Sequence, residues 1–192
     1  ETRRVTRTEK DGKITVLAER FEGRRFSRPG GVLHAIDGST YFTDAAGPGA
    51  GVYQVMRDGK LRAVATDFKA PNGLALTADQ RTLFVSDSAA NHIRSFAIKG
   101  DGRLVDGKVF ATLPAGAGGE AGGMVTDLDG DVYCAGPGGI WVFDPAGRHL
   151  GTISVPEAPA SLTWSDDYKT LYIAAQTSLY RVKLKRPGTR IH

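Results

Sequence analysis

Short apolar runs alternate with polar turns along the chain, and one such phrase occurs four times. The four segments are GSTYFTD (38–44), RTLFVSD (81–87), GDVYCAG (130–136) and KTLYIAA (169–175). Their aromatic residues, which lie 39 to 49 residues apart, are Tyr41, Phe84, Tyr133 and Tyr172. Repeats of this length indicate a fold built from equivalent units.

Each repeat predicts several strands in a fixed order. An apolar strand precedes the polar turn, and a third strand follows the second. In the first three repeats an Asp- or Gly-centred turn leads to a fourth strand, and such turns between alternating runs predict hairpins. Residues 3–17 repeat only the outer hairpin. Four strands per period predict an all-β fold, a β-propeller with four nearly complete blades and the outer half of another, in a single domain over residues 1–192. A sandwich or a solenoid would not explain this order.

In a propeller the first strand of each blade lines the central channel. The predicted starts of these strands carry Gly30, Asn72, Gly122 and Ala160 (or Ser161). Their side chains are expected to converge near the axis, so residues far apart in the sequence would form one site.

Charge pattern and hydropathy argue against two classes of function, nucleic-acid binding and membrane association. The net charge is +4, but basic and acidic residues alternate, and basic residues cluster only at Arg3, Arg4, Arg7 and at Arg24, Arg25, Arg28. This favours solvated strand faces over a nucleic-acid surface. No stretch approaches the roughly 20 apolar residues that span a bilayer, so no membrane association is expected. The chain begins at Glu1 without methionine, which fits a mature chain, a processed chain or a fragment, and leaves the compartment open.

Longer phrases of the chain resemble a known family. The phrases are RRVTRTEKDGKITVLAERFEGRRFSRPGGV, PNGLALTADQRTLFVSDS, AGGMVTDLDGDVYCAGPGGIWVFDPAGRHLGTISVPE and LYIAAQTSLYRVKLKRPG. They are similar to the gluconolactonase/regucalcin-like group of six-bladed propellers, relative to which the N-terminal blades are missing. The resemblance implies hydrolysis of lactones or organophosphate-type esters with a divalent cation, commonly Ca²⁺.

The resemblance also implies four metal ligands, of which one is present. Asn72 matches the family's PNG asparagine and is the expected metal ligand. The PND asparagine falls on Gly30 and its aspartate on Gly31. The aspartate of PDGM, which would assist as a base, falls on Gly122 after Ala121, so no catalytic residue is assigned. A glutamate of the first inner strand has no counterpart, and two further family asparagines fall on Ser27 and Ser161.

Two functions follow from this pattern. The first is a metal-dependent lactone or ester hydrolase. The second is a catalytically inactive propeller that serves as a binding or scaffold module. About a hundred residues would complete a six-bladed ring. The chain is therefore a fragment joined by a second chain, a contracted propeller, or part of an oligomer that closes the ring.

Other polar residues are assigned structural roles. Asp44 and Asp87, which end inner strands, are expected to support the channel, and Asp127, Asp129 and Asp131 are expected to form a solvated turn. Cys134, the only cysteine, is predicted to be a buried thiol. His34, His92, His149 and the terminal His192 lack ligand spacing. The Gly-rich segment 114–123 is a loop without the helix that a phosphate site needs.

Overall fold

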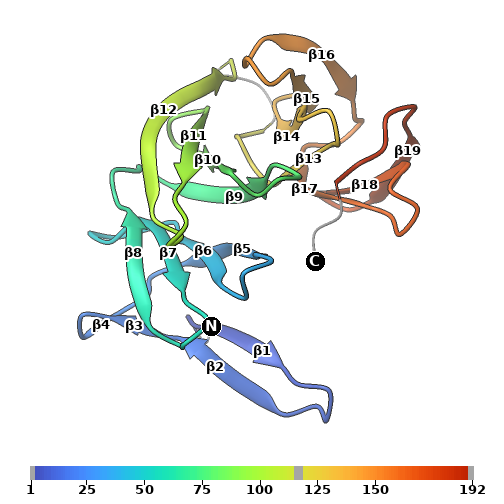
Figure 1. Ribbon diagram of the computed structural model, residues 1–192. Coiled ribbons are helices and arrows are strands. Elements are labelled where there is room, and N and C mark those ends of the chain that lie inside the picture. Colours follow the sequence, from blue (N-terminus) through green and yellow to red (C-terminus); the bar gives the residue numbers. More distant parts are fainter. Residues whose placement is uncertain (1–2, 115–118, 190–192) are drawn as a thin grey trace.

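The computed structural model describes residues 3–114 and 119–189, and these form 19 β-strands and no helix. His192 and residues 115–118 of the Gly-rich loop lie outside the described residues. In Figure 1 the sheets follow one another around a central axis in an open ring. The N-terminal hairpin and the last blade lie on either side of the opening. Within the described residues no helix has the length and apolarity needed to cross a bilayer.

The strands form four blades and two short hairpins. Blade I contains β5 (Pro29–His34), β6 (Thr40–Asp44), β7 (Gly51–Val55) and β8 (Leu61–Ala65). Blade II contains β9 (Pro71–Leu76), β10 (Thr82–Asp87), β11 (His92–Ile98) and β12 (Leu104–Thr112). Blade III contains β13 (Met124–Thr126), β14 (Val132–Gly136), β15 (Gly139–Phe143) and β16 (His149–Ser154). Blade IV contains β17 (Pro159–Trp164), β18 (Thr170–Ala175) and β19 (Leu179–Lys183). The hairpins are β1 (Val5–Thr8) with β2 (Ile14–Ala18), and β3 (Arg20–Phe21) with β4 (Arg24–Arg25).

Within each blade every strand pairs with the next along the chain, in antiparallel register. The first strands of successive blades contact one another: β5 lies against β9, β9 against β13, and β13 against β17. This arrangement confirms the predicted propeller and its incomplete ring. The β1–β2 hairpin was also predicted, whereas the short β3–β4 hairpin was not.

Aspartate side chains fix many of the hairpin turns. Among the described residues, eight aspartates accept a hydrogen bond from the backbone N–H two residues later: Asp11, Asp37, Asp58, Asp79, Asp101, Asp127, Asp144 and Asp167. This local bond mimics a backbone turn. In four of these turns the following residue is a glycine with positive φ, a conformation that glycine adopts without steric cost. The repeated Asp-Gly pairs therefore close the hairpins for a local chemical reason.

The apolar core lies in the joints between blades. Leu33, Tyr41, Leu74 and Val85 belong to the cluster that joins blades I and II. Corresponding clusters fill the joint between blades II and III, the joint between blades III and IV, and the joint between the N-terminal hairpin and blade I. All residues of β6 and β14 are buried because each of these central strands is covered on both faces. Burial of this apolar surface is the main stabilising term for the blade order.

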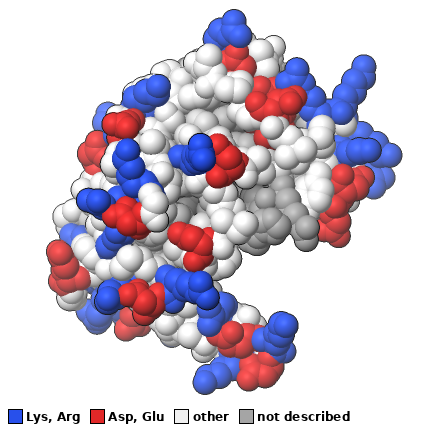
Figure 2. Space-filling model, viewed as in Figure 1, with Lys and Arg blue, Asp and Glu red and all other residues white. Residues whose placement is uncertain are grey.

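Charged side chains lie on the outer surface. On the face drawn in Figure 2, Lys and Arg are interspersed with Asp and Glu and form no single-sign area. Exposed ion pairs on the surface include Lys60 with Asp58 at 3.0 Å and Arg103 with Asp101. The mixture agrees with the solvated strand faces expected from the sequence.

Candidate functional site

The inner strands begin at one end of the propeller, and three of them begin with proline: Pro29, Pro71 and Pro159. Proline suits the first residue of a strand because it has no N–H to donate to the ladder. The next residues are Gly30, Asn72 and Ala160, and Gly122 precedes β13. The predicted channel positions therefore occur at the starts of the inner strands.

Neighbouring strand starts touch through their backbones. A Cβ added to Gly31 would overlap the carbonyl oxygen of Asn72, and one added to Gly73 would overlap that of Gly122. A Cβ on Gly122 would lie 2.8 Å from the carbonyl oxygen of Ala160. The four strand starts are thus consecutive neighbours, packed so closely that three of the contacts require glycine.

A threonine hydroxyl links the first two of these strands. Gly31 N–H donates to Thr43 Oγ1 at 2.9 Å, and Thr43 Oγ1 donates to the carbonyl oxygen of Asn72 at 2.9 Å. Because blade I contributes the first two residues and blade II the third, the hydroxyl crosses the joint between the blades.

A serine hydroxyl repeats the link at the next joint. Gly73 N–H donates to Ser86 Oγ at 2.8 Å, and Ser86 Oγ donates to the carbonyl oxygen of Gly122 at 2.7 Å. At the third joint, Gly123 N–H donates directly to the carbonyl oxygen of Ala160 at 2.9 Å. Sequence reasoning missed Thr43 and Ser86. Their signal was a hydroxyl residue immediately before the aspartate that ends the second strand of the first two repeats.

Ser88 sets the orientation of the Asn72 side chain. Asn72 Nδ2 donates to Ser88 Oγ at 3.0 Å, and Ser88 Oγ donates to the carbonyl oxygen of Ala121 at 3.0 Å. A serine hydroxyl has a single proton, so once it donates to Ala121 it accepts from its other partner. The Asn72 atom next to Ser88 is therefore the NH₂ group. Among the described residues no hydrogen bond engages Asn72 Oδ1, which remains available as an acceptor or ligand.

Asp44 and Asp87 hold the segments that lead into the inner strands. Asp44 is 3% exposed and accepts backbone N–H bonds from residues 27 and 28. Asp87 is 2% exposed and accepts backbone N–H bonds from residues 69 and 70. Both carboxylates are thus occupied by backbone donors, in keeping with the structural role expected from the sequence.

The oxygen donors at the strand starts do not by themselves make a cation site. Gly30 and Gly122 contribute no side chain, and Asn72 contributes one neutral amide oxygen. Across residues 3–114 and 119–189, no group of three or more His, Cys, Asp or Glu side chains is placed to hold a metal ion. Ca²⁺ takes six to eight oxygen ligands, usually including carboxylates. The described residues supply too few donors for that ion.

Gly30 and Gly122 differ in the space around them. A Cβ on Gly30 would lie 3.3 Å from Thr43 Oγ1, whereas one on Gly122 would lie 2.8 Å from a backbone oxygen of β17. The hydroxyl would have to shift by only a few tenths of an ångström, whereas a strand backbone cannot move without disturbing the blade. A side chain therefore fits at Gly30 and not at Gly122.

The prediction of a solvated turn at Asp127, Asp129 and Asp131 is wrong for two of the three residues. Asp127 is 0% exposed and accepts backbone N–H bonds from the other two, and burial raises the pKa of its carboxyl group. Asp131 is 3% exposed and accepts a bond from Arg186 at 2.7 Å. The backbone of residues 187–189 bonds to this region and covers it, which a local sequence pattern does not indicate.

The remaining candidates do not form a site. Cys134 is a fully buried free thiol, as predicted, and burial raises its pKa to about 12. His149 stacks on Trp141 with ring centroids 4.3 Å apart, and His34 contacts Thr40 at 3.1 Å. His34, His92 and His149 lie on strands of three different blades.

Comparison with known proteins adds to this geometry. Residues 1–177 match the family described as the SMP-30/Gluconolactonase/LRE-like region. A gluconolactonase of Zymomonas mobilis is 29% identical over 91% of this chain and 55% of its own length. The chain thus spans about half the length of this relative.

Solved structures agree with the observed blades. A gluconolactonase from Xanthomonas campestris superposes with a TM-score of 0.85 and 31% identity, over 97% of this chain and 66% of its own. A calcium-binding protein, regucalcin, from Agrobacterium tumefaciens gives a TM-score of 0.76 at 17% identity, over 94% of this chain and 68% of its own. The second likeness concerns the fold alone.

Proposed function

Because this chain belongs to the SMP-30/Gluconolactonase/LRE-like family, we propose that it hydrolyses lactones at the end of the channel where the inner strands begin. The observation that carries the proposal is Asn72, whose amide oxygen remains free at the start of β9. The relative that matches 91% of the chain is a gluconolactonase, which supports a lactone substrate.

The cation of the proposed site needs ligands from beyond the described residues. Asn72 would be this chain's contribution, since Gly30 and Gly122 have no side chains. The chain covers 66% of the Xanthomonas campestris enzyme, so a complete ring contains further inner strands. We propose that a second chain closes the ring and supplies carboxylates, because another copy of this chain would bring the same glycines at positions 30 and 122. A cation bound there would polarise the lactone carbonyl.

The residues of this chain would shape the channel wall and position the Asn72 oxygen. The backbone contacts between strand starts hold the channel wall rigid, and the bond to Ser88 turns the Asn72 oxygen away from Ser88. An oxygen held in place in this way loses little entropy when it binds a ligand. The lactone would be the small-molecule partner. A specific lactone is not assigned, because loops at the channel end would select it.

The test measures hydrolysis of glucono-δ-lactone by the chain purified together with the protein that closes its ring, in a pH-stat, with CaCl₂ or with EDTA. We expect turnover with calcium that EDTA abolishes and that Asn72→Ala lowers by at least about tenfold. Lys60→Ala, in the turn between β7 and β8, should leave the rate unchanged. Native mass spectrometry of the same sample should detect a complex larger than one chain.

A further arm tests the ligand positions themselves. Gly30→Asn adds an amide oxygen where a Cβ has room, 3.3 Å from Thr43 Oγ1, and should strengthen calcium binding in titration calorimetry. Absence of both calcium binding and hydrolysis in the wild-type sample, at every oligomeric state observed, would overturn the proposal. That result would favour a catalytically inactive binding or scaffold propeller.

A further inference from the structure

A row of polar side chains crosses the joint between blades I and II. Tyr41, Gln54 and Arg62 are paired across β6, β7 and β8. Gln54 Nε2 donates to Tyr41 Oη at 3.0 Å, and Arg62 Nε donates to Gln54 Oε1 at 2.8 Å. The row is then tied to blade II, because Tyr41 Oη donates to the carbonyl oxygen of Gly102 at 2.9 Å and Arg62 donates to that of Asp101.

The equivalent row of blade II lacks such bonds. Phe84, Ser95 and Lys108 are paired across β10, β11 and β12 in the same way. Ser95 is only 6% exposed, yet among the described residues its hydroxyl has no hydrogen-bond partner. Lys108 likewise forms no side-chain hydrogen bond or ion pair within the described residues. Two polar groups therefore face blade III without a partner in the part of the chain that the structure describes.

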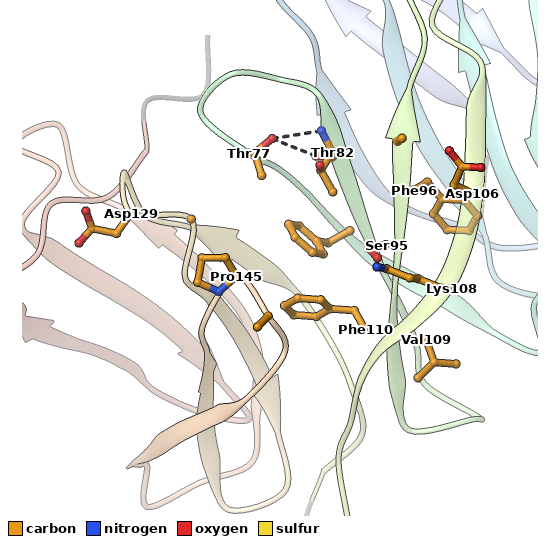
Figure 3. Close-up of a pocket in the computed structure, with 14 residues that line it drawn as sticks. Thr77, Thr82, Ser95, Phe96, Asp106, Lys108, Val109, Phe110, Asp129 and Pro145 are labelled. Carbon is orange, nitrogen blue, oxygen red and sulfur yellow. Dashed lines mark hydrogen bonds between the residues drawn. The ribbon is translucent and has the colours of Figure 1, made fainter.

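The side chains of Phe84, Ser95 and Lys108 are shorter than their counterparts in blade I. They border a cavity of about 500 Å³ between blades II and III. Figure 3 shows Ser95 and Lys108 side by side, close to the ring of Phe110. The rings of Phe84 and Phe110 pack with centroids 4.8 Å apart and form an apolar wall. The opposite wall belongs to two turns of blade III and contains Asp129, Gly130, Pro145 and Ala146.

The joint between blades I and II also has a cavity of about 500 Å³, but of the polar row it contacts only Tyr41. The hydroxyl of Tyr41 is already bonded there. Arg81 and Lys99, which line the counterpart cavity, are exposed side chains. The cavity beside Ser95 differs in having on its wall the hydroxyl of a buried serine, which has no hydrogen-bond partner among the described residues. It also borders Thr77, which follows the end of β9, so it lies at the opposite end of that strand from Asn72.

We propose that this cavity binds a small aromatic carboxylate. The ring would pack on Phe84 and Phe110, and the carboxylate would accept hydrogen bonds from Lys108 Nζ and Ser95 Oγ. Aromatic rings favour tilted or offset contacts with one another, and a charge-assisted hydrogen bond is stronger than a neutral one.

Two carboxylates of the protein also line the cavity and bear on its charge. Asp129 lies 3.4 Å from Arg186, which offsets its charge. In Figure 3 the carboxylates of Asp106 and Asp129 lie at the edge of the cavity and point away from the ring of Phe110. The ammonium of Lys108 is therefore the charge nearest to the proposed position of the ligand carboxylate.

The test follows the ¹⁹F NMR signal of 4-fluorobenzoate added to the full chain in EDTA. We expect saturable broadening, and binding at least about tenfold weaker for 4-fluorobenzyl alcohol, which has the same ring without the charge. Lys108→Met should weaken binding of the carboxylate about tenfold without affecting the fold, since Lys108 is exposed. Lys60→Met is the matched control and should leave binding unchanged.

A second variant tests the shape of the cavity. Ser95→Gln installs the side chain that blade I carries at the equivalent position, and it should occupy the place proposed for the ligand carboxylate and abolish binding. The proposal is overturned if 4-fluorobenzoate does not bind, if the alcohol binds equally well, or if Lys108→Met binds like wild type. Because Asn72→Ala should bind 4-fluorobenzoate normally, failure of the lactone proposal is distinguishable from failure of this one.

Discussion

Asn72 and Ser88 form a hydrogen bond of fixed direction, in which the asparagine amide donates and the serine hydroxyl accepts at 3.0 Å. The direction is set by Ala121, whose carbonyl oxygen takes the only serine proton. The bond joins the start of β9 to the residue after β10, and it leaves the asparagine oxygen free.

Ser88→Ala should leave the Asn72 side chain free to rotate. The substitution removes both bonds of the hydroxyl and leaves the Ala121 carbonyl without its donor, which costs about 1–3 kcal/mol of unfolding free energy. It should also weaken calcium binding or lactone turnover by several-fold, because the Asn72 amide is then free to rotate. Urea unfolding and calorimetry measure the two effects. Ser154→Ala, at the exposed end of β16, is the control. Unchanged binding in Ser88→Ala would mean that the bond does not position Asn72.

Two adjacent glycines of β5 should respond differently to alanine. A Cβ on Gly31 overlaps the carbonyl oxygen of Asn72, whereas one on Gly30 meets only Thr43 Oγ1 at 3.3 Å. We expect Gly31→Ala to lower the unfolding free energy by about 1–3 kcal/mol or more, and Gly30→Ala to change it by less than about 1 kcal/mol. Urea denaturation of the two variants is the measurement. Equal losses would show that β5 and β9 are not in close backbone contact.

Glu157 should make a contribution to stability that depends on pH. Its carboxylate accepts bonds from Thr177 N–H, Thr177 Oγ1 and Ser178 Oγ, which lower its pKa from 4.5 to about 2. Because the folded pKa is depressed, the contribution is complete above about pH 4.5 and disappears as the pH falls towards 2.

The measurement is the difference in Tm between the wild-type chain and Glu157→Gln. The difference should be constant near neutral pH and shrink as the pH falls through that window. Glu120→Gln, which changes a glutamate in the loop before β13, should give no such trend. A difference as large at pH 2 as at neutral pH would contradict the assignment of these bonds to the charged carboxylate.

Cys134 should be unreactive in the folded chain. The thiol is buried in β14, and burial raises its pKa to about 12, so neither access nor thiolate is available near neutral pH. Ellman's reagent should modify it only in urea, at a rate that follows unfolding. The surface variant Ser154→Cys provides a control that should react at once with one thiol. Rapid modification of the native wild-type thiol would mean that β14 opens far more often than its packing indicates.

Much of the fold could be predicted from the sequence because the relevant signals are local. The alternation of apolar and polar residues predicted the strands, and Asp-Gly turns predicted the hairpins. The repeat around Tyr41, Phe84, Tyr133 and Tyr172 predicted the blades. The β3–β4 hairpin was missed because two-residue strands leave no periodic pattern.

The sequence was enough to locate the candidate site, but not to identify the residues that orient its side chains. The strand order placed Gly30, Asn72 and Gly122 at the starts of the inner strands, and the structure agrees. The metal role of Asn72 remains a proposal. The residues that orient it and link the blades, Ser88 and Thr43, gave only a weak signal, because their partners belong to other strands or to the next repeat.

Tertiary structure decided what depends on contacts between blades. A side chain at Gly31 would overlap Asn72 because two inner strands touch. Asp127 is buried because residues 187–189 cover its turn. The cavity beside Ser95 is lined by residues of blades II and III together, so it exists only where the two blades pack. The sequence by itself determined which units form and in what order, since each hairpin is closed by its own residues. Where these units touch, and what remains open between them, was decided by their packing around the axis.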